Sequence, residues 1–471
     1  MTSSPHEMPG QAPRHSTLRI AIIAVCIGVA FAAALGLRSA PQKKESAPVV
    51  LTAEQTIAQL PSPDGNSATN LALGVAFTKL REKNDDPVRW VGLGDVFAQM
   101  MRDTADEKFY GHAEMAYQFA LRLEPGSADA LAGMAWVTGG RHQFDRSREW
   151  ADRALAADPG NAAACGILGD AALELGDYDT AYAHYQKMMD LKPDLSSWGR
   201  GAHLLYLTGD SKKGMWLMEK AVKAGGPFAE NTAWCRAKLA MMLFHQGAYI
   251  SAAQTLEPPL KVGSKNTQVL LAAGRIAAAR EDFPAAEKYF QTVLESGLNH
   301  DALVALGDLR AVAGKMDEAE KFYAQVEALE AAQTARVGHG HLAMAKFYAD
   351  HDRKPIEALR MAEVRKLTRN VNEADTLAWV YFKNGDQPHA IEAIKRALSQ
   401  KTQDAEIHFH AGMIAAKFGD RVSAQNHLQT ALSLSPRFSI LQAPVAVATL
   451  EKLGNGSSAA VVPVTSTVLA R

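Results

Sequence analysis

The spacing of four prolines is the feature that most constrains this chain. Pro125, Pro159, Pro193 and Pro227 follow one another at intervals of 34, 34 and 34 residues. Proline has no backbone N–H to donate and cannot continue a helix, so each of them marks the end of a helical segment. A fixed period of this length predicts a repeated helix–turn–helix unit, which buries its apolar face only by stacking on its neighbours.

Small residues recur at matching places in these units. In the unit that ends at Pro193, Gly169 lies in the first helical stretch, Gly176-Asp177 marks the turn and Ala181 opens the second stretch. A small side chain lets two helices approach closely, and a glycine ends a helix in the left-handed conformation. The small first-helix positions are Ala135, Gly169, Ala202, Ala240, Gly274, Gly307, Ala345, Ala378 and Gly412.

This pattern resembles the tetratricopeptide-repeat proteins over residues 94–438, and the exported or membrane-anchored bacterial type in particular. The last unit, AEIHFHAGMIAAKFGDRVSAQNHLQTALSLSP, carries the full pattern. The resemblance implies an all-α fold, a right-handed α-solenoid of about ten tetratricopeptide-type helix pairs, preceded by one N-terminal transmembrane or signal helix. The units are expected to start near residues 94, 128, 162, 195, 233, 267, 300, 338, 371 and 405. Pro258-Pro259 is expected to shorten or bend the second helix of the fifth unit.

The ends of the chain differ in composition from the repeats. Residues 20–37 form an 18-residue run without a charge, which at 1.5 Å per residue just spans a bilayer core. We predict a polar tail at 1–19, a transmembrane anchor or signal segment at 20–37, a linker at 38–70, the solenoid at 71–438 and a flexible tail at 439–471. The expected location is the inner (cytoplasmic) membrane, single-pass, with the repeats on the periplasmic side. Secretion after cleavage near Ala34-Leu35-Gly36 is the alternative.

Composition and motifs argue against several functions. With 50 Lys+Arg and 51 Asp+Glu, the chain has no basic field for nucleic acid. Its three cysteines are far apart and form no CxxC pair. The sequence contains no HExxH, GxSxG, phosphate-binding loop or dinucleotide-binding glycine motif. We therefore predict no enzyme activity, no catalytic residues, no cofactor and no small-molecule substrate.

The resemblance implies that the first helices line an inner groove in which a partner lies. One residue after each small position is expected to face this groove, and Phe382 follows three residues after one of them. These candidates are Arg102, Trp136, Asp170, His203, Met241, Arg275, Asp308, Lys346, Trp379, Phe382 and Met413. Their mixture of charges and large apolar side chains suits a partner helix or extended peptide, with core packing as the alternative for Trp136 and Trp379. The predicted function is a membrane-tethered, non-enzymatic scaffold that binds a partner polypeptide in the groove.

Histidines suggest an alternative function. His410 and Met413 are three residues apart and share a helix face, while His339 and His341 would converge only outside a helix. Imidazole and thioether ligands together suit copper, which would make the chain an envelope metal-handling protein. No carboxylate or thiol completes the set, so we predict no metal site. A second alternative is an accessory subunit of an envelope biogenesis or export complex.

Overall fold

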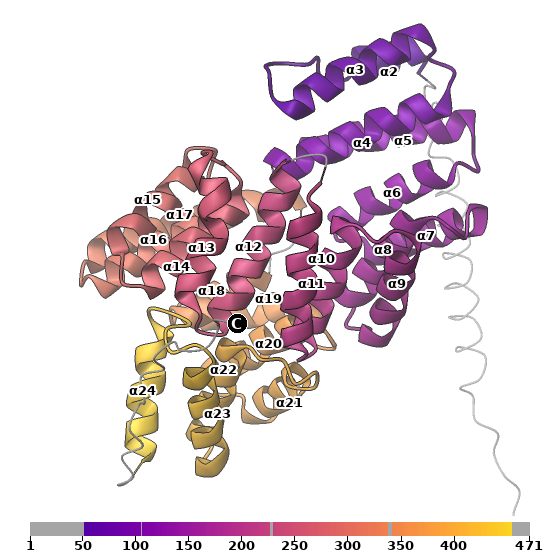
Figure 1. Cartoon of the computed structure of the whole chain (residues 1–471). Helices are drawn as coiled ribbons and strands as arrows, with labels where there is room; N and C mark the ends of the chain where they lie inside the picture. Colours follow the sequence, from indigo (N-terminus) through magenta and orange to yellow (C-terminus); the bar gives the residue numbers. More distant parts are fainter. Residues whose placement is uncertain (1–50, 105, 227–228, 338–341, 455–471) are drawn as a thin grey trace, which may run out of the picture. The chain divides into compact units, whose positions relative to one another are not determined.

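The computed structural model describes residues 51–454 except 105, 227–228 and 338–341. Every regular element in this part of the chain is helical (Figure 1), which confirms the all-α prediction. None of the described helices is long and apolar enough to cross a membrane. The predicted polar tail at 1–19, the apolar segment at 20–37, residues 38–50 of the linker, His339, His341 and the last residues from 455 lie outside the described residues.

The chain divides into two units, residues 1–58 and 59–471. The described part of the first unit contains one short helix, α2 (Ala53–Ala58), which lies within the predicted linker. The second unit begins with α3 (Ala68–Glu82), which starts three residues before the predicted array. Ser67 caps α3 by accepting a hydrogen bond from the backbone N–H of Asn70, which explains where this helix begins.

Ten successive helix pairs follow within the described residues. The first helices of the pairs are α4 (Pro87–Thr104), α6 (Ala128–Gly140), α8 (Ala162–Glu174), α10 (Leu195–Leu207), α12 (Ala229–His245), α14 (Thr267–Ala279), α16 (His300–Val312), α18 (Leu342–Asp350), α20 (Val371–Lys383) and α22 (Ala405–Lys417). The second helices are α5 (Lys108–Leu123), α7 (Phe144–Ala157), α9 (Tyr178–Leu191), α11 (Ser211–Ala224), α13 (Tyr249–Lys261), α15 (Phe283–Leu294), α17 (Met316–Val337), α19 (Pro355–Ala362), α21 (Gln387–Ala397) and α23 (Arg421–Leu434).

The recurrent Gly-Asp dipeptide separates the two helices of a pair. Gly176 adopts a positive φ of 72°, which a glycine reaches without steric cost. Asp177 then accepts a hydrogen bond from the backbone N–H of Thr180 and caps α9. The same side-chain cap opens four other second helices, at Asp210, Asp282, Asp386 and Asp420. A Gly-Asp dipeptide therefore stops one helix and starts the next, and at Asp282 the preceding residue with positive φ is Glu281 instead of glycine.

The small residues work as the sequence predicted, by making room for a large side chain on the second helix. A Cβ atom added at Gly169 would lie 2.4 Å from the Tyr185 ring. Gly274 stands in the same relation to Phe290. A buried aromatic ring thus covers the glycine of its own pair, and this packing holds the two helices together.

Turns in the third, fourth and fifth helix pairs contact loops late in the chain. The Tyr178 hydroxyl accepts a hydrogen bond from the backbone N–H of Val371 at 2.9 Å. Ser211 Oγ donates to Gln403 Oε1 at 2.8 Å, and Tyr249 Oη lies 2.8 Å from Ser435 Oγ. These three contacts join residues 193, 192 and 186 positions apart. The array therefore closes on itself within the second unit, with three early turns docked on the loops before α20, α22 and the C-terminal helix.

The C-terminal helix α24 (Gln442–Leu453) lies within the segment predicted to be a flexible tail, and that prediction is wrong for these residues. The helix packs on α23, with Ala443 and Ala446 buried against it. Its apolar face was hidden in the sequence because valine and alanine alternate there without a recognisable repeat signature.

The shortening expected at Pro258-Pro259 also needs correction. Helix α13 continues through both prolines and ends at Lys261, so it is not shortened. Each of the two prolines lacks a backbone N–H donor, and the buried side chains of Leu256 and Pro259 keep this last turn packed in place.

Two glycines with the same backbone conformation provide a matched test of the closure. Gly176 and Gly314 have φ values of 72° and 74°. A Cβ at Gly176 would lie 2.3 Å from the carbonyl carbon of Arg369, whereas a Cβ at Gly314 would meet no described atom within 4 Å. We expect Gly314→Ala to lower the free energy of unfolding by about 1–2 kcal/mol, the cost of the left-handed conformation. Gly176→Ala should cost roughly 1–3 kcal/mol more, because the methyl group also forces the docked loop away. Urea unfolding of both variants measures the difference, and equal losses would contradict the closure.

Candidate functional site

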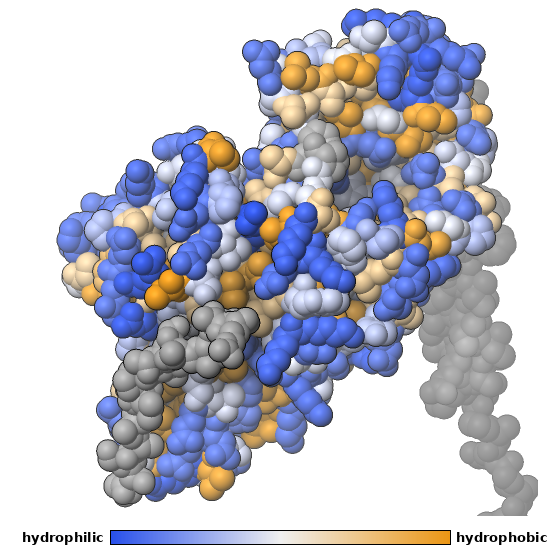
Figure 2. All heavy atoms as spheres, in the orientation of Figure 1, coloured by the Kyte–Doolittle hydropathy of each residue, from blue (hydrophilic) through white to orange (hydrophobic). Residues whose placement is uncertain are grey.

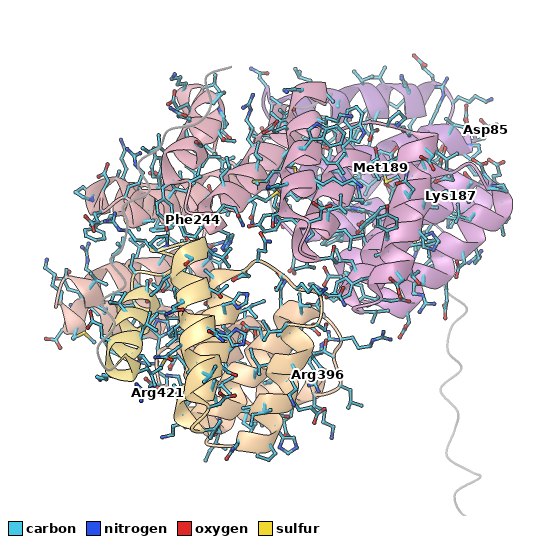
Figure 3. All side chains as sticks on the ribbon, turned by 60° about the horizontal axis from the view of Figure 1, so that its bottom comes forward. Asp85, Lys187, Met189, Phe244, Arg396 and Arg421 are labelled. Carbon is cyan, nitrogen blue, oxygen red and sulfur yellow. The ribbon has the colours of Figure 1, made fainter. Side chains whose placement is uncertain are left out.

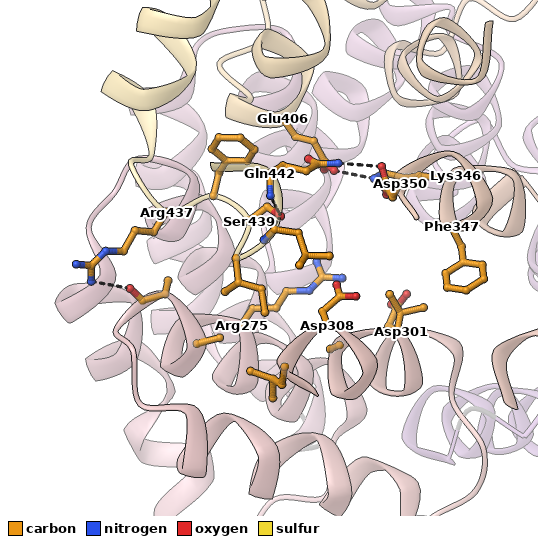
Figure 4. Close-up of a pocket in the computed structure, with 18 of the residues that line it drawn as sticks. Arg275, Asp301, Asp308, Lys346, Phe347, Asp350, Glu406, Arg437, Ser439 and Gln442 are labelled. Carbon is orange, nitrogen blue, oxygen red and sulfur yellow. Dashed lines mark hydrogen bonds and ion pairs between the residues drawn. The ribbon is translucent and has the colours of Figure 1, made fainter. Parts of the chain in front are cut away.

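Two adjoining cavities lie on the inner side of the array, with volumes of about 340 Å³ and 250 Å³. They share Met241, His245, Arg275 and Asp301 in their walls. First helices of the fourth to eighth pairs form one side, and the loops before α22 and α24 contribute to the other. Figure 4 shows the larger cavity. The face of the molecule in Figure 2 is mostly hydrophilic, and its hydrophobic groups are scattered. The cavities are therefore a better candidate for a binding site than this outer face is.

Five of the eleven predicted groove residues line the cavities. His203 lies in the smaller cavity, Asp308 and Lys346 lie in the larger one, and Met241 and Arg275 face both. They come from consecutive first helices, as the resemblance implied. Phe244, which lies three residues after Met241, also lines the larger cavity and is close to the C-terminal segment (Figure 3).

The other six predicted residues line neither cavity. Trp379 is only 3% exposed, and its ring stacks on Phe382 at 4.8 Å and on the His410 ring at 4.2 Å. It belongs to the hydrophobic core, with Phe382 and Met413 packed partly buried beside it. Neighbouring helix pairs cover this ring, so Trp379 offers no surface to a partner.

The first three predicted residues lie in the N-terminal pairs. Trp136 is half-buried against Tyr110, with a centroid distance of 5.2 Å, and the Arg102 guanidinium lies 5.4 Å above its ring. Asp170 is already engaged by an ion pair with Arg200 at 2.9 Å. Contact of these residues with a partner stays a prediction.

Buried tyrosines hold several of the inward aspartates. Tyr185 donates its hydroxyl to Asp170 at 2.8 Å, and Tyr323 donates to Asp308 at 2.9 Å. Burial, followed by the nearby Asp170 carboxylate, raises the pKa of Tyr185 well above its ordinary value. The tyrosine therefore stays a proton donor, and the aspartate stays an acceptor with a fixed position. Asp308 also contacts the ring of His351 at 2.7 Å.

Lys346 is the centre of a charged cluster at one wall of the larger cavity. Its ammonium group contacts Asp350 Oδ2 and Glu406 Oε1, both at 2.6 Å (Figure 4). Gln442 donates from its side-chain nitrogen to Asp350 Oδ1 at 2.9 Å. Burial opposes ionisation of Glu406, but the Lys346 charge outweighs it and lowers the pKa of Glu406 to about 2. Helices α18, α22 and α24 are thereby joined through charge-assisted hydrogen bonds.

His410 lies next to this cluster and is fully buried. Its Nδ1 atom is 2.9 Å from both carboxylate oxygens of Asp375. Burial lowers the pKa of His410, but the Asp375 carboxylate overcomes that effect, so the pKa lies above its ordinary value. The structure thus pairs His410 with a carboxylate that the sequence analysis did not identify. The i,i+4 spacings of Lys346 to Asp350 and of Glu406 to His410 were readable signals for this cluster.

The walls of the smaller cavity hold charges of both signs, from Arg275, Lys238, Asp301 and Asp404. Arg275 is exposed in the wall. Lys238 also lines the cavity, and its ammonium group lies 5.2 Å from the centroid of the Trp234 ring. Neither makes an ion pair with a carboxylate within the described ranges. Burial, and then the charge of Arg275, lowers the pKa of Lys238. The two cavities can therefore hold a ligand that has both apolar and charged groups, an acidic side chain included.

Comparison with known proteins identifies the repeat. The family model for the tetratricopeptide repeat matches residues 133–196 and 271–335, so the chain contains tetratricopeptide repeats. PilF of Pseudomonas aeruginosa is similar, with 22% identity and a TM-score of 0.33, covering 43% of this chain and 90% of PilF. PilW, a type IV pilus biogenesis factor, has 17% identity and a TM-score of 0.37, covering 43% and 92%. Yeast Tom70 has 15% identity and a TM-score of 0.35, covering 82% and 92%. No curated protein matches the sequence.

Two half-buried histidines give the stability a pH dependence. Burial lowers the pKa of both His203 and His408 to about 4, below the value of about 6.5 expected in the unfolded chain. The unfolded state therefore binds protons at a higher pH than the folded state does. As a result, the free energy of unfolding falls as the pH is lowered from about 6.5 toward 4. We expect His203→Gln to reduce the drop in urea midpoint between pH 7 and pH 4.5. The exposed His389→Gln serves as the control, and an unchanged drop in His203→Gln would refute the assignment.

Proposed function

We propose that this protein is a non-enzymatic scaffold that binds a segment of a partner polypeptide in the two inner cavities. The observation that carries the proposal is that His203, Met241, Arg275, Asp308 and Lys346, from five successive helix pairs, line two adjoining cavities that share part of their walls. Repeat arrays of this kind present extended concave surfaces to their ligands.

The chemistry of the walls favours a polypeptide as the ligand. Met241 and Phe244 supply apolar contacts, and Arg275 supplies a charged donor without a carboxylate partner in the described structure. Tyr206 and Gln268 add hydrogen-bonding groups in the smaller cavity. An extended peptide offers backbone donors and acceptors together with alternating side chains, and it matches such a mixed lining better than a wholly apolar molecule does.

Photocrosslinking from inside and outside the array tests where the partner binds. A photoreactive phenylalanine analogue at Met241 would face both cavities, whereas the same analogue at Val262, which is 82% exposed, would lie outside them. We expect one discrete protein adduct from position 241 and none from position 262.

The purified adduct partner then allows affinity to be measured. Arg275→Ala should weaken its binding by roughly tenfold, which corresponds to loss of one charge-assisted hydrogen bond of about 1.5 kcal/mol. An adduct that forms only from position 262, or an affinity that Arg275→Ala leaves unchanged, would rule out the inner cavities as the binding site.

We further propose that residues 20–37 tether the scaffold to the cytoplasmic membrane, with the repeats on the periplasmic side. The supporting observation is the 18-residue uncharged run. In membrane fractions washed with alkaline carbonate, the full chain should stay in the pellet and a variant without residues 20–37 should move to the supernatant. Recovery of the full chain in the supernatant, with its N-terminus after Gly36, would instead establish cleavage and secretion.

A further inference from the structure

Three side chains next to the larger cavity converge on one point. One ligand atom each from Asp350, Glu406 and His410 lies within 4.8 Å of the other two. Asp350 ends α18, whereas Glu406 and His410 lie one turn apart on α22. Two carboxylates and an imidazole at this separation match the ligand set of a divalent metal ion.

The second observation concerns the free nitrogen of His410. Asp375 occupies Nδ1, and Nε2 has no hydrogen-bond partner among the described residues, although the side chain is 0% exposed. Buried polar atoms are rarely left unpaired, so this nitrogen needs a ligand. A carboxylate on one ring nitrogen is also the usual support for a metal-binding histidine, because it fixes the ring orientation and strengthens the other nitrogen as a donor.

We propose that Asp350, Glu406 and His410 form a binding site for a divalent transition-metal ion of the zinc type. His410 would bind through Nε2 and each acid through one carboxylate oxygen, with Asp375 as the orienting residue behind the imidazole. Imidazole with two carboxylates favours Zn²⁺ over Mg²⁺ or Ca²⁺, which prefer oxygen ligands alone. This set differs from the histidine and methionine ligands that the sequence suggested, and His410 is the residue they share.

Lys346 decides how such a site would behave. Its ammonium group contacts both acidic ligands at 2.6 Å, so a metal ion must take its place. Lys346 lines the larger cavity, which gives its side chain room to turn away. Asp350, Glu406 and Asp375 supply three carboxylates, and Lys346 is the only Lys or Arg in ion-pair contact with them in the described part of the chain. Lysine and metal therefore compete for the same negative charge.

This competition predicts that removing the Lys346 charge tightens metal binding, which a simple ion-pair network does not predict. The full chain, stripped with a chelator, is titrated with Zn²⁺ against a chromophoric competitor. We expect one equivalent to bind, His410→Gln and Glu406→Gln to weaken binding by about 10- to 100-fold, and Lys346→Met to tighten it by at least several-fold. The thermal midpoint of Lys346→Met should also rise on adding Zn²⁺, because the metal binds the folded state alone.

A matched control comes from the same helix. His408 lies two residues before His410 on α22, and its Nδ1 atom lies 3.0 Å from His427 Nδ1 instead of in the carboxylate cluster. His408→Gln should leave Zn²⁺ affinity unchanged. Loss of binding in His408→Gln but not in His410→Gln would overturn the proposal, as would a Lys346→Met variant that binds no more tightly than the parent. If His410→Gln does not fold, Glu406→Gln and Lys346→Met still decide the outcome.

Discussion

The docking of early turns on late loops is the constraint on which the rest of the second unit depends. In an open array each pair contacts only its neighbours, and stability is a sum of local terms. Here a Cβ atom added at Gly176 or Gly209 would lie 2.3 Å from the backbone of Arg369 or 2.7 Å from that of Lys401, so neither position has room for a side chain. Gly247 approaches the Leu434 carbonyl oxygen less closely, at 3.2 Å from its added Cβ. These long-range contacts add cooperativity that a local repeat model does not contain, because separating the early and late pairs breaks all three together.

The closure also explains which inward residues form a site. The smaller cavity takes His203 and Tyr206 from the fourth pair, Asn372 from the ninth, and Thr402 from the loop before the tenth. Its walls exist only while the early and late pairs are in contact. The charged cluster around Lys346 differs in this respect, since α18, α20, α22 and α24 are near one another along the array. One site therefore depends on closure and the other depends only on local stacking.

The sequence predicted the repeat well because its signals are local. Helix stops at glycine, caps at aspartate and small residues under aromatic rings each involve residues within one helix pair, and a period of 34 makes them visible. The predicted groove residues, which follow the small residue of each first helix, line the cavities at Met241 and Arg275. At Trp379 the sequence left groove and core open, and the structure places the ring in the core. Whether an inward residue faces a cavity or a neighbouring helix depends on contacts between pairs, which the sequence of one pair does not contain.

Contacts between distant repeats had no comparable signal. Tyr178, Ser211 and Tyr249 each lie at or near the start of a second helix, where polar residues are ordinary, and nothing in one repeat indicates a partner about 190 residues away. Asp375 illustrates the same difficulty for the charged cluster. It lies in a first helix like many other acids of the chain, and only its position opposite His410, 35 residues on, gives it a role.

Closure and binding are linked by the shared residues of the smaller cavity. A ligand that contacts both His203 and Asn372 binds the closed array and not an open one, so its binding energy adds to the docking contacts. The converse also holds, since a change that weakens docking, such as a side chain at Gly209, lowers the fraction of chains able to bind. The affinity of the smaller cavity for a ligand therefore depends on the residues that form the docking contacts as well as on the residues that touch the ligand. The Lys346 cluster, which needs no closure, would keep its own affinity under the same change.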